Sequence, residues 1–217
     1  MAVKNLPEKA TKILRDGSMV YMFSGIVLLV TYQYSFYYIT GLMALLIIFT
    51  TYFLRDPKRN WTMNKDAIVS SADGKVIYAG EGYEEMFMGG KCNKVVIFMN
   101  VFDVHRNRAP IEGVVKFYRY NRGKFRPAMK LNNLENNEHN LIGIEGKNVK
   151  CVVSQIAGLV AQRVIFYKQL GDLLHQTDEL GIIRYGSANT IYFPPEYRIC
   201  VKPGDKVKAG VDVLAKK

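Results

Sequence analysis

A long apolar run near the N-terminus is the strongest hydropathy signal in the chain. From Gly17 to Leu54 there is no Asp, Glu, Lys or Arg. One membrane-spanning helix needs about 20 apolar residues, so the run predicts a helical hairpin with short crossings at 19–31 and 36–53, joined at 32–35. Aromatic side chains crowd the joint, as they do at membrane interfaces. Two full spans and a hairpin dipping into one leaflet both fit. A helical pair buried in a soluble core normally shows a polar stripe, which this run lacks.

The charge pattern predicts where this hairpin lies. Basic residues flank it on both sides: Lys4, Lys9, Lys12 and Arg15 before it, and Arg55, Lys58, Arg59 and Lys65 after it. Because positive flanks stay in the cytoplasm, we expect a cell-membrane protein with both ends of the hairpin on the cytoplasmic face. The whole chain carries 30 Lys+Arg against 19 Asp+Glu, a net charge of +11, which suits an anionic partner such as acidic lipid or nucleic acid.

After Asp56-Pro57 the pattern changes to alternating, β-branched segments separated by glycine-containing turns. We therefore divide the chain into a basic segment 1–16, a membrane hairpin 17–54 and a β domain 55–217. The β domain is predicted to be mainly β, a compact sandwich or barrel-like arrangement of short strands. Residues 156–164 fit a short helix or part of a strand. The predicted strands are Ala67–Ser70, Lys75–Ala79, Val95–Met99, Val114–Tyr118, Leu141–Glu145, Val149–Gln155, Ile191–Phe193 and Tyr197–Val201.

Two segments of the β domain resemble each other. Gly171-Asp172 and Gly204-Asp205 are each followed by apolar positions, as in the hairpins of lipoyl- or biotinyl-type domains. A duplicated β unit and a chance match of turn residues both explain this similarity.

The cysteines and histidines indicate no metal site. Three cysteines, Cys92, Cys151 and Cys200, stand far apart without a CxxC pair, which predicts buried thiols in a reducing compartment rather than disulfides or a zinc site. His139 is predicted to lie in a solvated loop and His175 on the polar face of a turn. Neither has a second ligand at metal-binding spacing.

Three stretches carry residues that can act together. Asp73 lies in 72–77, His105 lies in 102–110, and Ser187 follows Gly186 in 180–187. Alone, an Asp-Gly pair signals a hairpin turn, a single histidine is usually a satisfied hydrogen-bonding residue, and most Gly-Ser pairs are turns. A serine hydroxyl, however, needs a base to take its proton and a carboxylate to orient that base. The three residues supply one of each.

Together these stretches resemble the phosphatidylserine decarboxylase family, specifically its short form, which includes archaetidylserine decarboxylase-like members. The resemblance implies that Ser187 Oγ attacks the Gly186 carbonyl, with His105 as base and Asp73 orienting it. Cleavage between residues 186 and 187 would give fragments 1–186 and 187–217, which stay together as a heterodimer. Ser187 would become a pyruvoyl group, so no metal and no external cofactor are expected. A higher oligomer stays open.

The implied reaction is decarboxylation of phosphatidylserine, or of an archaeal serine phospholipid, to the ethanolamine phospholipid. The pyruvoyl ketone acts as an electron sink, and His105 delivers a proton to the product. Arg106 and Arg108 suit the substrate phosphodiester, because guanidinium matches its geometry; a solvated basic loop is the alternative. Two departures from the family stand out: Arg108 occupies the place of a second histidine in longer members, and Ala188 that of an arginine in short members.

Two other functions were weighed against this one. The first is a non-enzymatic, membrane-anchored adaptor or carrier with lipoyl-like β hairpins. The second is an RNA-binding β domain, for which basic residues would have to cluster with stacking aromatics. Many of the aromatics lie in the apolar run instead. We therefore expect the partners to be a phospholipid membrane and a serine phospholipid, with no nucleic acid.

Overall fold

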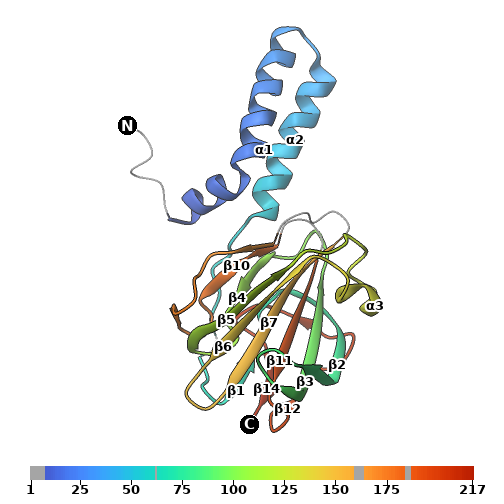
Figure 1. The fold of residues 1–217 in the computed structure, drawn as a ribbon. Helices are drawn as coiled ribbons and strands as arrows, with labels where there is room; N and C mark the ends of the chain where they lie inside the picture. Colours follow the sequence, from blue (N-terminus) through green and yellow to red (C-terminus); the bar gives the residue numbers. More distant parts are fainter. Residues whose placement is uncertain (1–7, 62, 159–163, 184–186) are drawn as a thin grey trace. The chain divides into compact units, whose positions relative to one another are not determined.

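The computed structural model describes residues 8–61, 63–158, 164–183 and 187–217. The chain separates into a helical unit, Met1–Pro57, and a β unit, Lys58–Lys217 (Figure 1).

The helical unit is the predicted hairpin. Helix α1 (Glu8–Gln33) and helix α2 (Tyr37–Phe53) are linked side by side by hydroxyl hydrogen bonds, one of them Thr31 Oγ1 to Thr40 Oγ1 at 2.9 Å. The sequence predicted a short first crossing at 19–31, and the helix that contains these residues is the longer of the two. Helix α1 has 26 residues because it extends back through the charged segment before the apolar run, whereas α2 has 17. By length and composition, Ala10–Gln33 suffices to cross a membrane.

The β unit confirms the mainly-β prediction. Each predicted strand coincides with an observed one. Six short strands, at 106–108, 164–166, 173–174, 179–183, 206–207 and 213–216, were missed because a strand of a few residues is too short to show an alternating pattern. Residues 156 and 157 end a strand and residue 164 begins one; 159–163 lie outside the described residues. The strands are β1 (Ala67–Val69), β2 (Gly74–Glu84), β3 (Gly90–Met99), β4 (Arg106–Arg108), β5 (Gly113–Asn121), β6 (His139–Glu145), β7 (Lys150–Ala157), β8 (Val164–Phe166), β9 (Leu173–Leu174), β10 (Glu179–Ile183), β11 (Ser187–Phe193), β12 (Arg198–Ile199), β13 (Lys206–Val207) and β14 (Val213–Lys216), with the short helix α3 (Leu131–Leu134) between β5 and β6.

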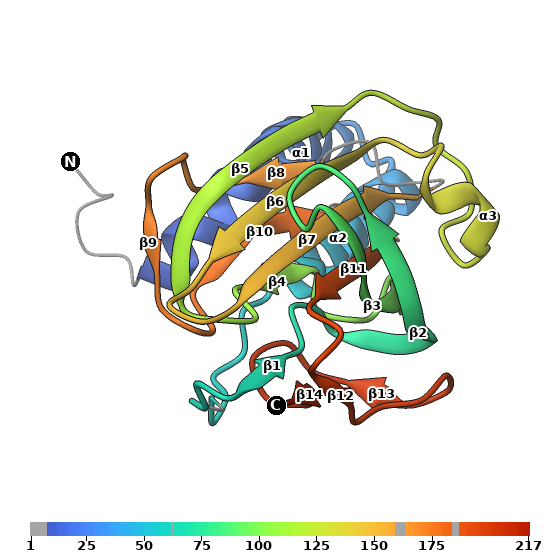
Figure 2. The ribbon, with the colours of Figure 1, turned by 60° about the horizontal axis from the view of Figure 1, so that its bottom comes forward.

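Eight strands form one antiparallel sheet in the order β13-β2-β3-β11-β7-β6-β5-β9, which curls into a half-barrel (Figure 2). Two three-stranded sheets, β1-β14-β12 and β4-β10-β8, accompany it. Alternate side chains of the long strands face inward, so Val95, Ile97 and Met99 of β3 join Ile142 and Ile144 of β6 in the main core.

The similarity between the two Gly-Asp segments reflects a structural duplication. At Gly171-Asp172 the glycine N–H donates to the carbonyl of Val115 (2.8 Å), and the Val115 N–H donates back to the aspartate carbonyl (3.0 Å). At Gly204-Asp205 the same pair of bonds is made with Val76, both at 2.8 Å. The strand order β13-β2-β3-β11 repeats as β9-β5-β6-β7, and β1-β14-β12 repeats as β4-β10-β8. The predicted duplicated hairpin unit is thus confirmed, and β11 and β7 meet where the two copies join.

The prediction of buried cysteines holds for two of the three. Cys92 and Cys151 are buried, and burial raises the pKa of the Cys151 thiol. Cys200 is exposed, so the prediction is wrong there. It follows the short strand β12, which pairs only with β14 and leaves the next residues at the sheet margin.

Candidate active site

Two connections run between the large sheet and the β4-β10-β8 sheet, and their ends are paired. One leads from Met99 at the end of β3 to β4; the other leads from β10 to Ser187 at the start of β11. The register pairs Ser187 with Met99 and Ile182 with Arg106. Gly186, the predicted cleavage residue, lies outside the described residues, but the chain from residue 183 to 187 can span at most about 14 Å. The pairing therefore holds His105, just before β4, beside Ile183, the last described residue before Ser187.

His105 is fully buried and has a defined tautomer. Its Nδ1 lies 2.9 Å from the carbonyl oxygen of Asp103. A carbonyl oxygen only accepts, so Nδ1 must carry the proton, and in the neutral ring the second lone pair then lies on Nε2. The His105 carbonyl in turn accepts the N–H of Ile183 at 3.2 Å. The backbone thus holds this imidazole at Asp103 and joins its residue to Ile183, while its role as a base stays a prediction.

Ser187 is fully buried between β3 and β7, its two neighbours in the sheet. Its hydroxyl donates to the sulfur of Met99 at 3.4 Å. Thioether sulfur is a weak acceptor. Breaking this hydrogen bond therefore costs little free energy when the hydroxyl rotates toward a stronger acceptor such as an imidazole nitrogen.

Asp73 lies at the same end of the sheet but has its own partner. Arg59 donates to both carboxylate oxygens at 2.6 Å, and the Ala209 N–H donates at 2.8 Å. Within the described residues no hydrogen bond joins Asp73 to His105, so its orienting role stays a prediction. The hairpin-turn interpretation is wrong: Gly74 begins β2 at φ 152°, where a Cβ would lie 2.1 Å from the Phe98 carbonyl oxygen.

A buried polar group that sequence reasoning missed lies beside the serine. Asn189 shares a strand face with Ser187 and accepts the Ser71 hydroxyl at Oδ1. Its Nδ2 has no hydrogen-bond partner within the described part of the chain. The alternation in β11 could have found it: Ser187 and Asn189 are polar residues on the same alternate positions as Ile191 and Phe193, which face the core.

The two arginines predicted for the headgroup differ in exposure. Arg106 is 1% exposed and forms an ion pair with Glu179, so the solvated-loop interpretation is wrong for it. Arg108 is half-buried; its guanidinium stacks over Trp61 at 4.3 Å and donates to the Thr177 carbonyl at 3.1 Å. A headgroup role stays a prediction for both.

The other two histidines lie outside this arrangement. His139 is half-buried at the start of β6, with Nδ1 2.7 Å from the Asn137 carbonyl oxygen and Nε2 3.0 Å from Asn121 Nδ2. The solvated-loop prediction is therefore wrong for His139. His175 is exposed beside a turn, as predicted.

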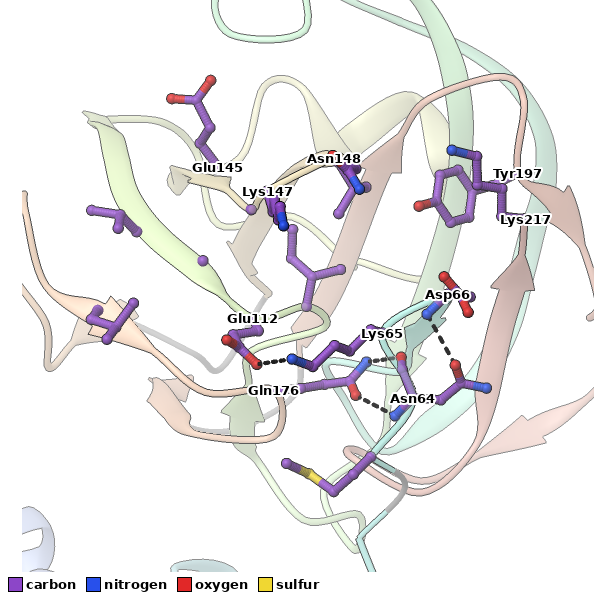
Figure 3. Close-up of a pocket in the computed structure, with 17 residues that line it drawn as sticks. Asn64, Lys65, Asp66, Glu112, Glu145, Lys147, Asn148, Gln176, Tyr197 and Lys217 are labelled. Carbon is purple, nitrogen blue, oxygen red and sulfur yellow. Dashed lines mark hydrogen bonds and ion pairs between the residues drawn. The ribbon is translucent and has the colours of Figure 1, made fainter.

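A cavity of about 420 Å³ lies at the opposite end of the β unit (Figure 3). Two hydrogen bonds between Gln176 and Asn64, one donated by each residue, and an ion pair between Lys65 and Glu112 border it. In the duplication Glu112 corresponds to Asp73 and Asp66 to His105. The described lining of this cavity holds no His, Ser or Cys. The counterpart of the Ser187 region therefore has no residue that could replace Ser187 or His105.

Comparison with known proteins identifies the family. Residues 46–215 match the model of the phosphatidylserine decarboxylase family. The phosphatidylserine decarboxylase proenzyme of Carboxydothermus hydrogenoformans is 39% identical over 176 residues, which cover 81% of this chain and 83% of the relative. The proenzyme of Geotalea uraniireducens is 34% identical over 207 residues, 95% of this chain and 97% of the relative. The similarity therefore extends through the catalytic unit and into the helical hairpin, and this chain belongs to the phosphatidylserine decarboxylase family.

Proposed function

We propose that the chain is a self-processing, pyruvoyl-dependent decarboxylase that converts phosphatidylserine, or an archaeal serine phospholipid, to the ethanolamine phospholipid. The observation that carries this proposal is the backbone-oriented imidazole of His105 beside the segment leading into Ser187. Family membership supports the reaction class.

Self-cleavage begins when Nε2 of His105 takes the Ser187 hydroxyl proton and Oγ attacks the Gly186 carbonyl carbon. The amide nitrogen of Ser187 leaves, takes up a proton and becomes a free amine, so an ester replaces the peptide bond. Loss of a proton from the Ser187 Cα then expels the Gly186 carboxylate from Cβ. Water hydrolyses the resulting dehydroalanine to a pyruvoyl group and ammonia.

The buried surroundings of residue 187 fit a pyruvoyl group. The group supplies an electrophilic carbonyl that withdraws electrons from the substrate. The unpartnered Nδ2 of Asn189 is a donor for a carbonyl oxygen on the same strand face. His105, which is fully buried like residue 187, is placed to return a proton to the product.

The activity is tested with the purified chain in vesicles that contain phosphatidylserine. We expect mass spectrometry to show ethanolamine phospholipid accumulating, and borohydride added with the substrate to trap an adduct on fragment 187–217. A protein that forms product while its fragment starts with an ordinary serine amine would contradict the pyruvoyl chemistry.

Asn189→Ala is expected to slow self-cleavage by about 10²–10³-fold, the usual cost of losing one donor to a developing oxyanion. We propose that Nδ2 donates to the Gly186 carbonyl oxygen during attack by Ser187. The half-time of chain splitting on denaturing gels measures the effect, with a thermal melt to show that the variant is folded.

Thr190→Val is the matched control for Asn189. Thr190 is equally buried, its hydroxyl also lacks a partner within the described residues, and it points to the other face of β11. We expect it to split at the normal rate. Equal rates for Asn189→Ala and the unchanged chain would rule out the donor role.

The two fragments are expected to co-elute in native gel filtration and to separate only in denaturant. Fragment 187–217 contributes β11 between β3 and β7, β13 beside β2, and β14 beside β1, so its release would break four strand pairings. Gel filtration followed by a denaturing gel tests this. Loss of the small fragment on the native column would contradict the proposed heterodimer.

We also propose that the hairpin 17–54 anchors the catalytic domain 55–217 at the cytoplasmic face of the cell membrane. The apolar helix α1 and the basic residues that flank the hairpin support this location.

A further inference from the structure

We propose that a loop surface at the Ser187 end of the β unit docks onto an anionic phospholipid bilayer, which deepens the proposed function and rests on it. This docking surface combines exposed apolar and exposed basic side chains. Its members are Phe102, Phe125, Met129 and Leu131, with Arg122, Lys124, Arg126 and Lys130.

Most of the docking surface belongs to the loop 122–138, which the fold fixes next to the nucleophile. The buried Asn137 donates through Nδ2 to the carbonyls of Arg126 (2.7 Å) and Ala157 (2.8 Å). Ala157 is the β7 partner of Ser187 in the sheet register. In addition, Ala128 and Leu134 of this loop pack in one cluster with Ala188, the residue after the nucleophile.

Ala128, Leu134 and Asn137 fill the buried side of the loop, and the other apolar side chains of the loop are exposed to solvent. Met129 is 61% exposed, and Phe125 and Leu131 are also exposed. Phe102 is 64% exposed on the turn that leads to His105. Asn100 Oδ1 accepts the Phe102 N–H at 2.8 Å and Asp103 Oδ2 accepts the Asn100 N–H at 2.9 Å, which fixes this turn. Exposed apolar side chains on well-anchored loops mark an interaction surface.

The charge on the loop indicates what this surface contacts. Arg122, Lys124, Arg126 and Lys130 are all exposed, against two carboxylates in the same loop, Glu135 and Glu138. Basic residues interleaved with Phe, Met and Leu suit the interface of an anionic membrane, because the apolar side chains enter the acyl boundary while the cations meet the headgroups.

The duplication provides an internal comparison. The β5–β6 connection corresponds to the β2–β3 connection in the other copy, where residues 85–89 form a short turn. That turn contains no Lys or Arg, and the Glu84 carboxylate accepts the N–H groups of Met86, Phe87 and Met88. The long basic loop therefore lies at the Ser187 end of the sheet, whereas its short counterpart lies at the opposite end, as expected for a surface that serves the reaction.

A depth-sensitive probe on the full chain tests the proposal. In a Cys200→Ser background, which removes the exposed thiol, an environment-sensitive fluorophore is placed on Met129→Cys or on Lys147→Cys, an exposed position at the opposite end of the sheet. In vesicles of phosphatidylglycerol and phosphatidylcholine carrying shallow nitroxide lipids, we expect at least about threefold stronger quenching at 129, weakened by high salt. Equal quenching at both positions overturns the proposal. That result is also the one expected if the surface binds nucleic acid and not a membrane.

The same quenching is expected in the Ser187→Ala chain, because docking needs no catalysis. This measurement therefore tests docking independently of the proposed function. An activity arm adds Met129→Ser/Leu131→Ser, expected to lose about tenfold in turnover of bilayer phosphatidylserine but not of a short-chain, water-soluble serine phospholipid. Leu173→Ser is the matched control, since Leu173 is 63% exposed outside the docking surface. Equal loss on both substrates, or an equal effect of Leu173→Ser, contradicts docking.

Discussion

Ser187→Ala is expected to leave the chain as one polypeptide with no decarboxylase activity. Alanine has no oxygen to attack the preceding carbonyl, so neither the ester nor the pyruvoyl group can form. Removing a nucleophile that works with a base typically costs on the order of 10⁶-fold in rate. Intact mass and denaturing gels measure cleavage, and product formation from phosphatidylserine measures activity.

The buried environment of Ser187 makes a second buried serine the right control. Ser154 lies on the neighbouring strand β7 and is paired with Thr190 of β11. Ser154→Ala should split at the normal rate and retain activity. A Ser187→Ala chain that still breaks between 186 and 187 would show that another group is the nucleophile.

His105→Gln is expected to slow self-cleavage by about 10²–10⁴-fold, the contribution of a positioned general base. Glutamine can keep a hydrogen bond to the Asp103 carbonyl, which His105 makes now, but it cannot take a proton from the Ser187 hydroxyl. The fraction of split chain against time measures the effect, and a thermal melt shows whether the fold survives.

His139→Gln serves as the comparison for His105. Both imidazoles bond through Nδ1 to the carbonyl oxygen two residues earlier in the chain, but His139 is the first residue of β6, whereas the His105 carbonyl accepts the N–H of Ile183. It should process normally. If the His105→Gln chain splits as fast as the His139→Gln chain, the base has been misassigned.

Much of the fold could be predicted from local patterns. The uncharged run from Gly17 to Leu54 is long enough to require helices, and the alternation in segments such as 95–99 and 141–145 predicted strands of the large sheet. The Gly-Asp turns predicted the duplication because each aspartate closes its turn locally, accepting through Oδ2 the N–H of the residue three positions earlier at 2.9 Å. Two-residue strands such as β9 and β13 have no period of their own, and they exist only through pairing with β5 and β2.

The sequence by itself determined the residue types of the site: a serine after glycine, one histidine and one aspartate in separate segments. Only the tertiary structure decided which of them meet. Pairing of Ser187 with Met99 and of Ile182 with Arg106 brings His105 beside Ile183, ahead of the predicted cleavage position, while Asp73 is bound by Arg59. These contacts join residues far apart along the chain. Strand register and burial therefore set them, and no local pattern in the sequence encodes either.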